Sequence, residues 1–255
     1  MTFVRFARED AREDEIVAYG LLAGDEIQPL DGSPFGSWSE AGTPVALGAV
    51  RLLAPVDPGK GLALAGNFRD HLGGTPEPTQ PEPFWKTPNA FIGPGDTILL
   101  PPNLARVDAE GEAVAVIGQW CSRVSEREAL SYVLGYTCGN DVSGRPWQGG
   151  DNQWWRAKSA DTFGPIGPAI ATGLDPADLS VVTRINGNEV QRCGLADMIH
   201  NFAVTISFIS QAVTLQPGDV IFSGTSGTPA QLNDGDTCEV EIPGVGTLSN
   251  PVKLR

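Results

Sequence analysis

The sequence has few of the residues and segments that mark several common classes of protein. Its four cysteines lie far apart and form no C-x-x-C pair, which argues against a zinc ribbon or a dithiol redox motif. No segment approaches the roughly 18 consecutive apolar residues of a membrane span. The N-terminus also lacks the basic start and apolar run of a secretory signal. We therefore expect a cytoplasmic protein with reduced thiols that does not insert into a membrane.

Basic side chains are scarce as well. Lysine and arginine together number 17 against 31 aspartates and glutamates, giving a formal net charge of -14 and a pI near 4.4. Such a balance makes nucleic acid and anionic membranes poor partners. A small anionic substrate would need a locally positive pocket or a bound metal ion.

Glycine and proline are abundant, with 31 and 21 residues in a chain of 255. Many turns and short strands follow, so the composition favours a β-rich fold over a helical bundle. We predict a small N-terminal β-rich module over residues 1–57 and a larger domain over residues 58–255. The turn Asp57-Pro-Gly-Lys60 marks the boundary.

Two helices are predicted within the larger domain. Ser125 followed by Glu128 is a capping-box pattern that opens a helix to about Leu134. Residues 196–211 carry apolar side chains near helical spacing and are predicted to form an amphipathic helix. The proline-dense segment 73–83 cannot be helical throughout and is predicted to be an extended or mobile loop.

Glu110 and Glu112 are the most informative pair in the sequence. They stand at the head of an apolar run that is typical of a buried strand, where residues i and i+2 point to the same face. Two carboxylates side by side next to a core repel each other and need a counter-charge. Asp141, after another strand-like segment, is a third candidate ligand. Three carboxylates without histidine suit Mg²⁺ or Mn²⁺, although E-x-E is also common at exposed strand positions.

His71 and Lys158 are the candidate proton carriers. His71 follows a strand and precedes the proline-dense loop, a position typical of general acid/base groups, with a surface histidine as the alternative. Lys158 follows two tryptophans that could desolvate it and lower its pKa, with an ordinary surface lysine as the alternative. The second histidine, His200, falls within the predicted helix 196–211 and is expected to be structural.

Two further features could contact an anion. Arg145, four residues after Asp141, could bind a carboxylate with both guanidinium arms, or it could be a surface arginine. The small-residue loop 223–229 follows a strand and could bind an anion through backbone N–H groups and hydroxyls, or it could be a plain turn.

Taken together, these segments resemble the fumarylacetoacetate hydrolase superfamily over about residues 62–252. No single motif decides this, but the motifs occur in the order that the family has. They are residues 66–71 (GNFRDH), 84–86 (FWK), 93–96 (GPGD), 108–112 (DAEGE), 135–145 (GYTCGNDVSGR), 158–165 (KSADTFGP), 186–187 (NG), 197–199 (DMI), 215–221 (LQPGDVI) and 246–251 (GTLSNP).

The resemblance implies an α+β fold, a β-rich mixed-sheet roll, in a chain that is usually a homodimer. It implies that Glu110, Glu112 and Asp141 are metal ligands. By the same resemblance Lys158 matches the active-site lysine, and His71 the catalytic histidine on a lid. Three more residues match positions that contact the substrate: Arg145, Gln148 and Thr225.

The resemblance also implies a chemistry. Family members with an N-terminal module of this size act on small 2-oxo or 2-hydroxy-dienoic acids. They hydrolyse acylpyruvates, decarboxylate or isomerise ring-cleavage products, or decarboxylate oxaloacetate. A metal that holds the substrate's carboxylate and 2-oxo group would stabilise an enolate.

This chain departs from the family pattern at three positions. Gly74 stands where many members have a glutamate that orients the histidine, and only Glu77 or Glu82 on the loop could replace it. Pro146 and Ser226 are the other two departures.

The missing glutamate favours decarboxylation or isomerisation (tautomerisation), which needs no nucleophilic water. The alternatives are C–C hydrolysis of the acylpyruvate or fumarylpyruvate type, and a catalytically silent homologue that binds 2-oxo acids.

Overall fold

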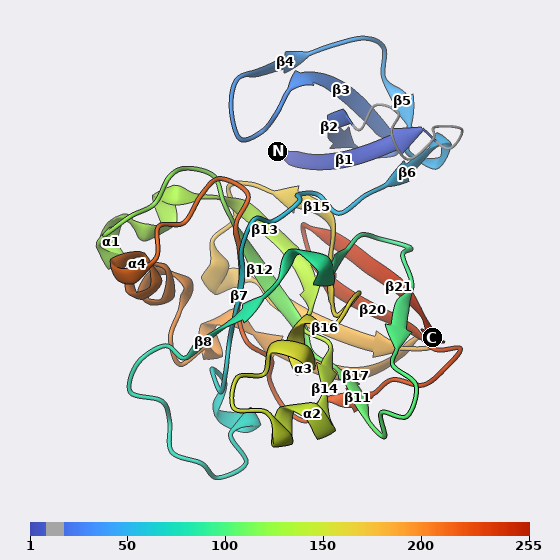
Figure 1. The fold of residues 1–255 in the computed structure, drawn as a ribbon. Coiled ribbons are helices and arrows are strands. Elements are labelled where there is room, and N and C mark those ends of the chain that lie inside the picture. Colours follow the sequence, from blue (N-terminus) through green and yellow to red (C-terminus); the bar gives the residue numbers. More distant parts are fainter. Residues whose placement is uncertain (9–17) are drawn as a thin grey trace.

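In a computed structural model, which describes residues 1–8 and 18–255, β-strands dominate and the helices are short (Figure 1). The prediction of a β-rich α+β fold is confirmed. Within the N-terminal module the segment from Ile16 to Leu22 is also predicted to form a strand, and its first two residues lie outside the described part. Within that part, no helix is both long and apolar enough to cross a bilayer.

The first strands of the chain form the module at the top of Figure 1, to one side of the larger body. These strands are β1 (Thr2–Arg8), β2 (Ala18–Ala23), β3 (Glu26–Gly32), β4 (Trp38–Glu40), β5 (Val45–Ala46) and β6 (Val50–Leu52), with the 3-10 turn η1 (Leu47–Ala49). The module is not a separate sheet, because β1 pairs with the long strand β15 of the larger body.

The larger body contains most of the main sheet and two smaller sheets. The main-sheet strands are β7 (Gly61–Leu64), β8 (Pro83–Lys86), β9 (Phe91–Ile92), β12 (Gly111–Ile117), β13 (Val133–Asn140), β15 (Gly164–Ala171) and β18 (Val220–Phe222). The second sheet has β10 (Ile98–Leu100), β16 (Ser180–Ile185), β17 (Asn188–Gly194), β20 (Thr237–Ile242) and β21 (Gly246–Leu254). The third has β11 (Val107–Ala109), β14 (Ser143–Gly144) and β19 (Ala230–Gln231).

The burial of β12 and β20 explains their different sequence patterns. All seven residues of β12 are buried, so the strand is a continuous run of small and apolar residues after Glu112. In β20 buried and half-buried residues alternate, and the sequence alternates with them. The site described below begins at the head of β12, where the core is densest.

The helices are short and lie at the edges of the sheets. They are α1 (Glu126–Ala129), α2 (Arg145–Gly150), α3 (Trp155–Ser159) and α4 (Phe202–Ala212). The remaining 3-10 turns are η2 (Arg69–His71), η3 (Pro88–Ala90), η4 (Leu130–Tyr132), η5 (Pro176–Asp178) and η6 (Leu195–Asp197). Figure 1 shows α1 and α4 side by side on one flank, and α2 and α3 together at the opposite end from the N-terminal module.

Both helix predictions were too long. α4 begins at Phe202 rather than at residue 196, because the Asn201 side chain accepts a hydrogen bond from the Val204 N–H and caps the helix there. His200 therefore precedes the helix. The helix that follows Ser125 ends at Ala129 and continues only as the 3-10 turn η4 before β13 begins.

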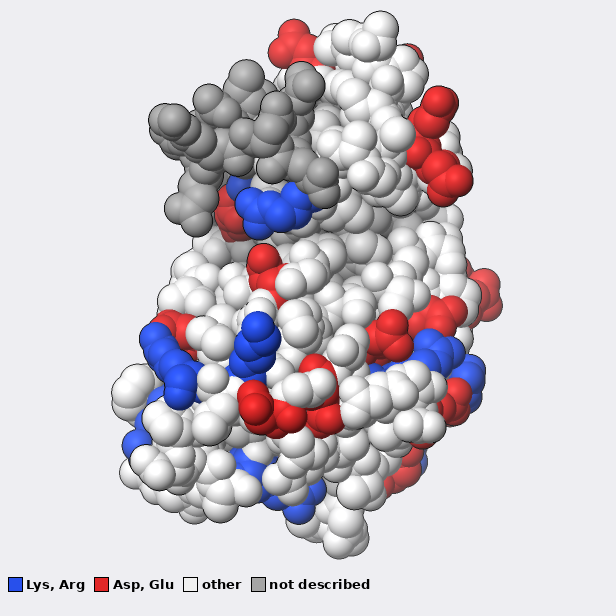
Figure 2. Space-filling view, turned by 90° about the vertical axis from the view of Figure 1, so that its right-hand side faces the viewer, with Lys and Arg blue, Asp and Glu red and all other residues white. Residues whose placement is uncertain are grey.

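Charged side chains are mixed over the surface seen in Figure 2. On the described part of that face, basic and acidic groups lie next to each other in small clusters, with no extended basic patch. The pairs Arg192–Glu189 and Arg156–Asp151 are examples of such neutralised surface charge.

Candidate metal centre and active site

Strand pairing brings the three predicted ligands together. β12 and β13 run antiparallel with Gly111 opposite Asn140, and the Asp141 N–H donates to the Glu110 carbonyl at 2.9 Å. One carboxylate oxygen from each of Glu110, Glu112 and Asp141 lies within 4.8 Å of the others. All three side chains are buried, with 1–3% of each residue exposed. The alternative that the glutamates are exposed strand residues is wrong.

The sequence pattern predicted that Glu110 lies inside a continuous strand, and this prediction is wrong. It sits at the break between β11, which pairs with β14 and β19, and β12, which joins the main sheet. The break is fixed by the Asn140 side chain, which accepts a hydrogen bond from the Glu110 N–H at 3.0 Å. Gly111 between the glutamates is required sterically, since a Cβ there would lie 1.8 Å from the Thr183 hydroxyl oxygen.

Lys158 and Arg145 supply positive charge to this cluster. The Lys158 ammonium, carried by α3, lies 2.5 Å from Glu110 Oε2 and 2.5 Å from Asp141 Oδ2. Arg145, at the start of α2, donates to Glu110 Oε1 at 2.6 Å and to Asp108 Oδ2 at 2.7 Å. Burial alone would raise the pKa of Glu110, but Lys158 and Arg145 outweigh it and hold that pKa well below its usual range.

The expected lowering of the Lys158 pKa is wrong. Burial does favour the neutral amine, but Asp141 and Glu110 outweigh burial and raise the pKa of Lys158. The desolvation also has a different source from the predicted one. The ring of Phe84, rather than a tryptophan, lies under the ammonium with its centroid 5.0 Å from Nζ, while Trp155 is 67% exposed.

Lys86 is a buried cation that the sequence reasoning did not assign to the site. Its ammonium donates to Asp141 Oδ1 at 2.7 Å, to the Phe163 carbonyl at 2.8 Å and to the Lys158 carbonyl. Burial lowers the pKa of Lys86 despite the opposing effect of Asp141. The available signal was the strand Phe84-Trp85-Lys86, in which Phe84 and Lys86 share the inward face.

Glu112 is the carboxylate without a cationic partner. Among the described residues it forms no salt bridge, and its Oε2 accepts one hydrogen bond, from the Gly224 N–H at 2.7 Å. Burial, reinforced by the charges of Asp141 and Glu110, raises the pKa of Glu112 well above its usual value. Gly224 can present its N–H because its φ is +81°, a conformation that favours glycine.

A divalent cation fits this cluster. The candidate ligand atoms are all carboxylate oxygens, which suit a hard ion such as Mg²⁺ or Mn²⁺. Glu112, which has no cationic partner among the described residues, would gain a counter-charge from such an ion. Glu110, Glu112 and Asp141 would hold it, and Lys86 and Ser143 position two of these carboxylates from outside, through Asp141 Oδ1 and Glu110 Oε2.

Thr225 and Gln148 lie close to the cluster, although by different routes. The Thr225 hydroxyl donates to the Gly111 carbonyl at 3.2 Å, between the two glutamates. Gln148 is one step further out and accepts from Arg145 at 2.7 Å. A second amide that sequence reasoning missed, Gln191 of β17, donates to Thr225 Oγ1 at 3.1 Å and to the Ser226 carbonyl at 2.7 Å.

His71 is oriented by a backbone carbonyl. Its Nδ1 lies 2.7 Å from the Gly227 carbonyl oxygen, which can only accept, so Nδ1 carries a proton and the lone pair of the neutral imidazole is on Nε2. Gly227 belongs to the same loop as Gly224 and Thr225, so the loop 223–229 connects His71 with Glu112.

Neither glutamate of the proline-dense loop replaces the glutamate missing at Gly74. Glu77 forms a two-armed ion pair with Arg69, at 2.8 and 3.2 Å, and is largely exposed. Glu82 makes no side-chain hydrogen bond to His71 in the described residues. Residues 73–82 form neither helix nor strand, Pro83 begins β8, and His200 holds the segment through a 3.0 Å contact between Nε2 and the Pro78 carbonyl.

The other two departures have structural explanations. Pro146 occupies the first turn of α2, where the absence of an N–H costs no hydrogen bond. Ser226 is buried and its carbonyl accepts from Gln191, so the loop turns toward β17 at this point.

Known protein families match this chain over most of its length. The profile of the family described as "Fumarylacetoacetate (FAA) hydrolase C-terminal" matches residues 61–253, and the profile "Rv2993c-like, N-terminal" matches residues 1–55. The chain is 44% identical to Protein Rv2993c of Mycobacterium tuberculosis over 249 residues, covering 92% of this chain and 94% of that protein.

Two further proteins carry functional names. The chain is 38% identical to the mitochondrial oxaloacetate tautomerase FAHD2A of Bos taurus, covering 80% of this chain and 69% of the tautomerase. Its structure is also similar to that of 5-carboxymethyl-2-hydroxymuconate delta-isomerase from Mycobacterium smegmatis. The TM-score is 0.92 and the identity 39%, over all of both chains.

Proposed function

The chain belongs to the fumarylacetoacetate (FAA) hydrolase family, and on this basis we propose that it is a divalent-metal-dependent isomerase (tautomerase) or decarboxylase of a small 2-oxo or 2-hydroxy-dienoic acid. The observation that carries the proposal is the buried carboxylate Glu112, which has no cationic partner in the described part of the chain, beside Glu110, Asp141 and Lys158. The names of the M. smegmatis isomerase and the bovine tautomerase support this reaction class.

The proposed ligands are Glu110, Glu112 and Asp141, with Mg²⁺ or Mn²⁺ as the ion. Such an ion, when bound, would act as a Lewis acid toward the negative charge that develops on the 2-oxo group. The protein would add electrostatic stabilisation in a site from which water is excluded, because every ligand side chain is buried.

The remaining roles follow from the hydrogen-bond donors at the site. Lys158 Nζ would donate to the oxygen of the enolate and keep it in place. Arg145, positioned by Gln148, would bind the substrate carboxylate, and the Thr225 hydroxyl would turn from the Gly111 carbonyl to donate to the same carboxylate. His71 Nε2, which keeps its lone pair, would take the proton from C3 of the keto form or return it to the enol.

The orientation of His71 supports proton transfer to carbon over activation of water. A carboxylate partner raises the basicity of a histidine and stabilises its protonated form, whereas the Gly227 carbonyl only fixes its orientation. Tautomerisation and decarboxylation need a positioned proton carrier but no nucleophilic water. C–C hydrolysis of acylpyruvates is therefore the less favoured alternative.

The proposal also includes the binding partner, the location and the oligomeric state of the enzyme. The binding partner is a small anionic 2-oxo acid, and the net charge of -14 supports neither a nucleic acid nor an anionic membrane as partner. A cytoplasmic homodimer remains our expectation.

The purified protein would be tested with the enol form of oxaloacetate, whose loss is followed by absorbance. We expect ketonisation that requires Mg²⁺ or Mn²⁺, stops with a chelator and returns when the ion is added back. Exchange of the C3 protons of pyruvate for deuterium should show the same dependence. Faster cleavage of an acylpyruvate than either reaction would favour the hydrolase, and no exchange with bound pyruvate would favour the silent binding protein.

A further inference from the structure

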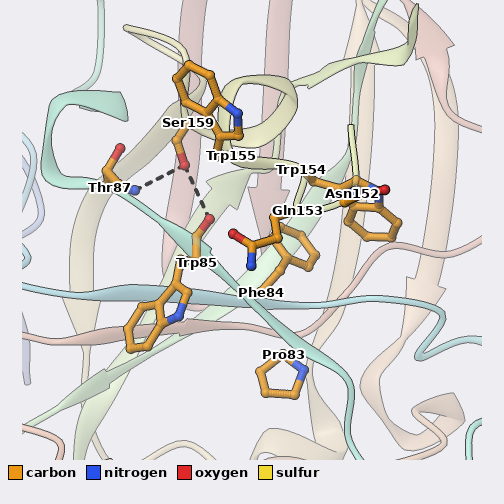
Figure 3. Close-up of a pocket in the computed structure, with 9 residues that line it drawn as sticks. All are labelled: Pro83, Phe84, Trp85, Thr87, Asn152, Gln153, Trp154, Trp155 and Ser159. Atoms are coloured by element: carbon orange, nitrogen blue, oxygen red, sulfur yellow. Dashed lines mark hydrogen bonds between the residues drawn. The ribbon is translucent and has the colours of Figure 1, made fainter. Parts of the chain in front are cut away.

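A pocket of about 390 Å³ lies next to the candidate site and shares Phe84 with it. Figure 3 shows the pocket enclosed by β8, by the connection between α2 and α3, and by α3 itself. Phe84 lines the pocket, and its ring centroid lies 5.0 Å from Lys158 Nζ. The ring therefore belongs both to this pocket and to the surroundings of Lys158.

The walls of the pocket also carry two cations of the cluster. β8 supplies Phe84 to the pocket and, two residues later, Lys86 to Asp141. α3 supplies Ser159 to the pocket and the preceding Lys158 to Glu110 and Asp141. A substrate whose enolate oxygen is held by Lys158 would thus have Phe84 and this pocket within reach of its other end.

The lining of the pocket is aromatic and amide in character. Trp85, Trp154 and Trp155 supply indole rings, and the Trp154 ring packs edge-on against Phe84 at 5.4 Å. In Figure 3 the amide of Gln153 extends toward the middle of the group of side chains that line the pocket. Trp85 and Trp155 remain 49% and 67% exposed, which is unusual for such large apolar side chains.

No lining residue in the described part of the chain is charged. The cations adjacent to lining residues along the chain are already engaged: Lys86 by Asp141, Lys158 by Glu110 and Asp141, and Arg156 by both oxygens of Asp151. A second carboxylate placed here would lose water without gaining a cation, which is costly. An uncharged group would instead bury apolar area against the indole rings, and a carbonyl or hydroxyl on it could use the Gln153 amide.

We propose that this pocket receives the end of the substrate remote from its 2-oxo acid group. The substrate is then a monocarboxylic 2-oxo acid with an uncharged, aromatic or alkyl substituent, rather than a dicarboxylate. This inference rests on the proposed function and adds the substrate class to it.

The test compares two enols that differ by one carboxylate: those of phenylpyruvate and 4-carboxyphenylpyruvate. With Mg²⁺ present, we expect kcat/KM for ketonisation to be roughly tenfold or more higher for phenylpyruvate. The enol of oxaloacetate serves as a third substrate that reports on the proposed function independently of the pocket.

Gln153→Arg places a cation in the pocket and should shift the ratio of the two kcat/KM values toward 4-carboxyphenylpyruvate by roughly tenfold, as a matched hydrogen-bonded charge should. Gln153→Met removes the amide without adding charge and should not shift the ratio toward 4-carboxyphenylpyruvate. Ser39→Arg adds the same charge at an exposed position of β4, in the N-terminal module, and should leave the ratio unchanged. Thermal unfolding of each variant verifies that it is folded.

Equal turnover of both phenyl substrates, or a ratio that Gln153→Arg does not change, would overturn the inference. Turnover of oxaloacetate alone would overturn it and leave the proposed function intact. Failure with all three enols would remove the proposed function and this inference with it.

Discussion

The carboxylate cluster and His71 belong to the same candidate site but are held by different kinds of contact. Glu110, Asp141, Lys158 and Lys86 are almost fully buried and joined by ion pairs of 2.5–2.7 Å between separate strands and helices. His71 is half-buried on a 3-10 turn and is positioned by one carbonyl of a glycine-containing loop.

This difference separates two properties that an enzyme needs. Glu110, Asp141, Lys158 and Lys86 combine structural and chemical roles, because removing any of these four takes a partner away from another buried charge. The His71 segment can be altered at little cost in folding, since its contacts are partly exposed to water. We therefore expect substitutions in the cluster to change stability and function together, and substitutions near His71 to change function alone.

The largest effect is expected at Glu112. Glu112→Gln should lower Mg²⁺-dependent turnover by roughly a thousandfold, about 4 kcal/mol, because a ligand to the ion is lost. In the metal-free protein the same change should raise the free energy of unfolding by about 1–3 kcal/mol, since an uncompensated buried carboxylate is removed. Urea denaturation with and without Mg²⁺, together with the enol assay, measures both effects.

The pH dependence gives a further check on Glu112. Because the pKa of Glu112 is raised, its carboxyl group keeps its proton to a higher pH in the folded metal-free protein than in the unfolded chain. The stability that this proton contributes is present below the usual carboxyl pKa and is lost as the pH rises toward the folded value. The advantage of Glu112→Gln should therefore be larger at pH 8 than at pH 5. Glu110→Gln is the control and should destabilise the metal-free protein, because Glu110 already has two cationic partners.

Lys86 is expected to show the next largest effect. Lys86→Met should lower the free energy of unfolding by about 3–5 kcal/mol, because Asp141 and two carbonyls lose a buried donor. Lys60→Met is the matched control. Lys60 also binds a buried aspartate, Asp219, but that carboxylate keeps two backbone N–H donors, so the cost should be about 1 kcal/mol. If urea denaturation shows the same loss of unfolding free energy in both variants, Lys86 contributes no more to stability than a lysine in an ordinary ion pair.

At His71 the function should change without the fold. His71→Asn should lower kcat/KM for the enol by about a hundredfold through loss of the proton carrier, with Mg²⁺ affinity unchanged. The free energy of unfolding should change by less than about 1 kcal/mol, because the side chain is only half-buried. His200→Asn, which alters the contact between the second histidine and Pro78 of the proline-dense segment, should retain most of the activity. A loss of Mg²⁺ binding in His71→Asn would contradict the separation of the two regions.

The smallest effect is expected at Glu77. Glu77→Gln weakens an exposed ion pair with Arg69 and should change the free energy of unfolding by less than about 0.5 kcal/mol. Activity should stay within about twofold of the unchanged protein, since Glu77 does not contact His71. A fall in kcat as large as that of His71→Asn would instead identify Glu77 as the carboxylate partner of His71 in the substrate complex.

Much of the fold and of the ligand set could be predicted from local patterns. The apolar run after Glu112 predicted a buried strand, and the abundance of glycine and proline predicted a β-rich fold. The ordered motifs predicted the family, which the comparisons confirm over residues 61–253. The predictions of the strand and of the β-rich fold are correct because the hydrophobic pattern of a strand and the formation of turns depend mainly on neighbouring residues.

Other features escaped prediction because they depend on contacts far along the chain. The start of α4 was set by an Asn201 cap that the hydrophobic pattern did not reveal. Lys86 looked like any lysine in a short strand, and its role emerges only where Asp141, 55 positions away, meets it. The pKa of Lys158 was predicted in the wrong direction because the opposing charges were not known to be so close.

The sequence by itself determined the type of site: hard oxygen ligands, two candidate proton carriers, and no glutamate three residues after His71. Only the tertiary structure decided which charges are compensated. Within residues 1–8 and 18–255 it gives Glu110 two cations and Glu112 none, and it gives His71 a carbonyl in place of a carboxylate. The physical reason is that residue type sets the charge of a group. Its desolvation and its partners, which determine the pKa and reactivity, are set by elements that are distant in the chain.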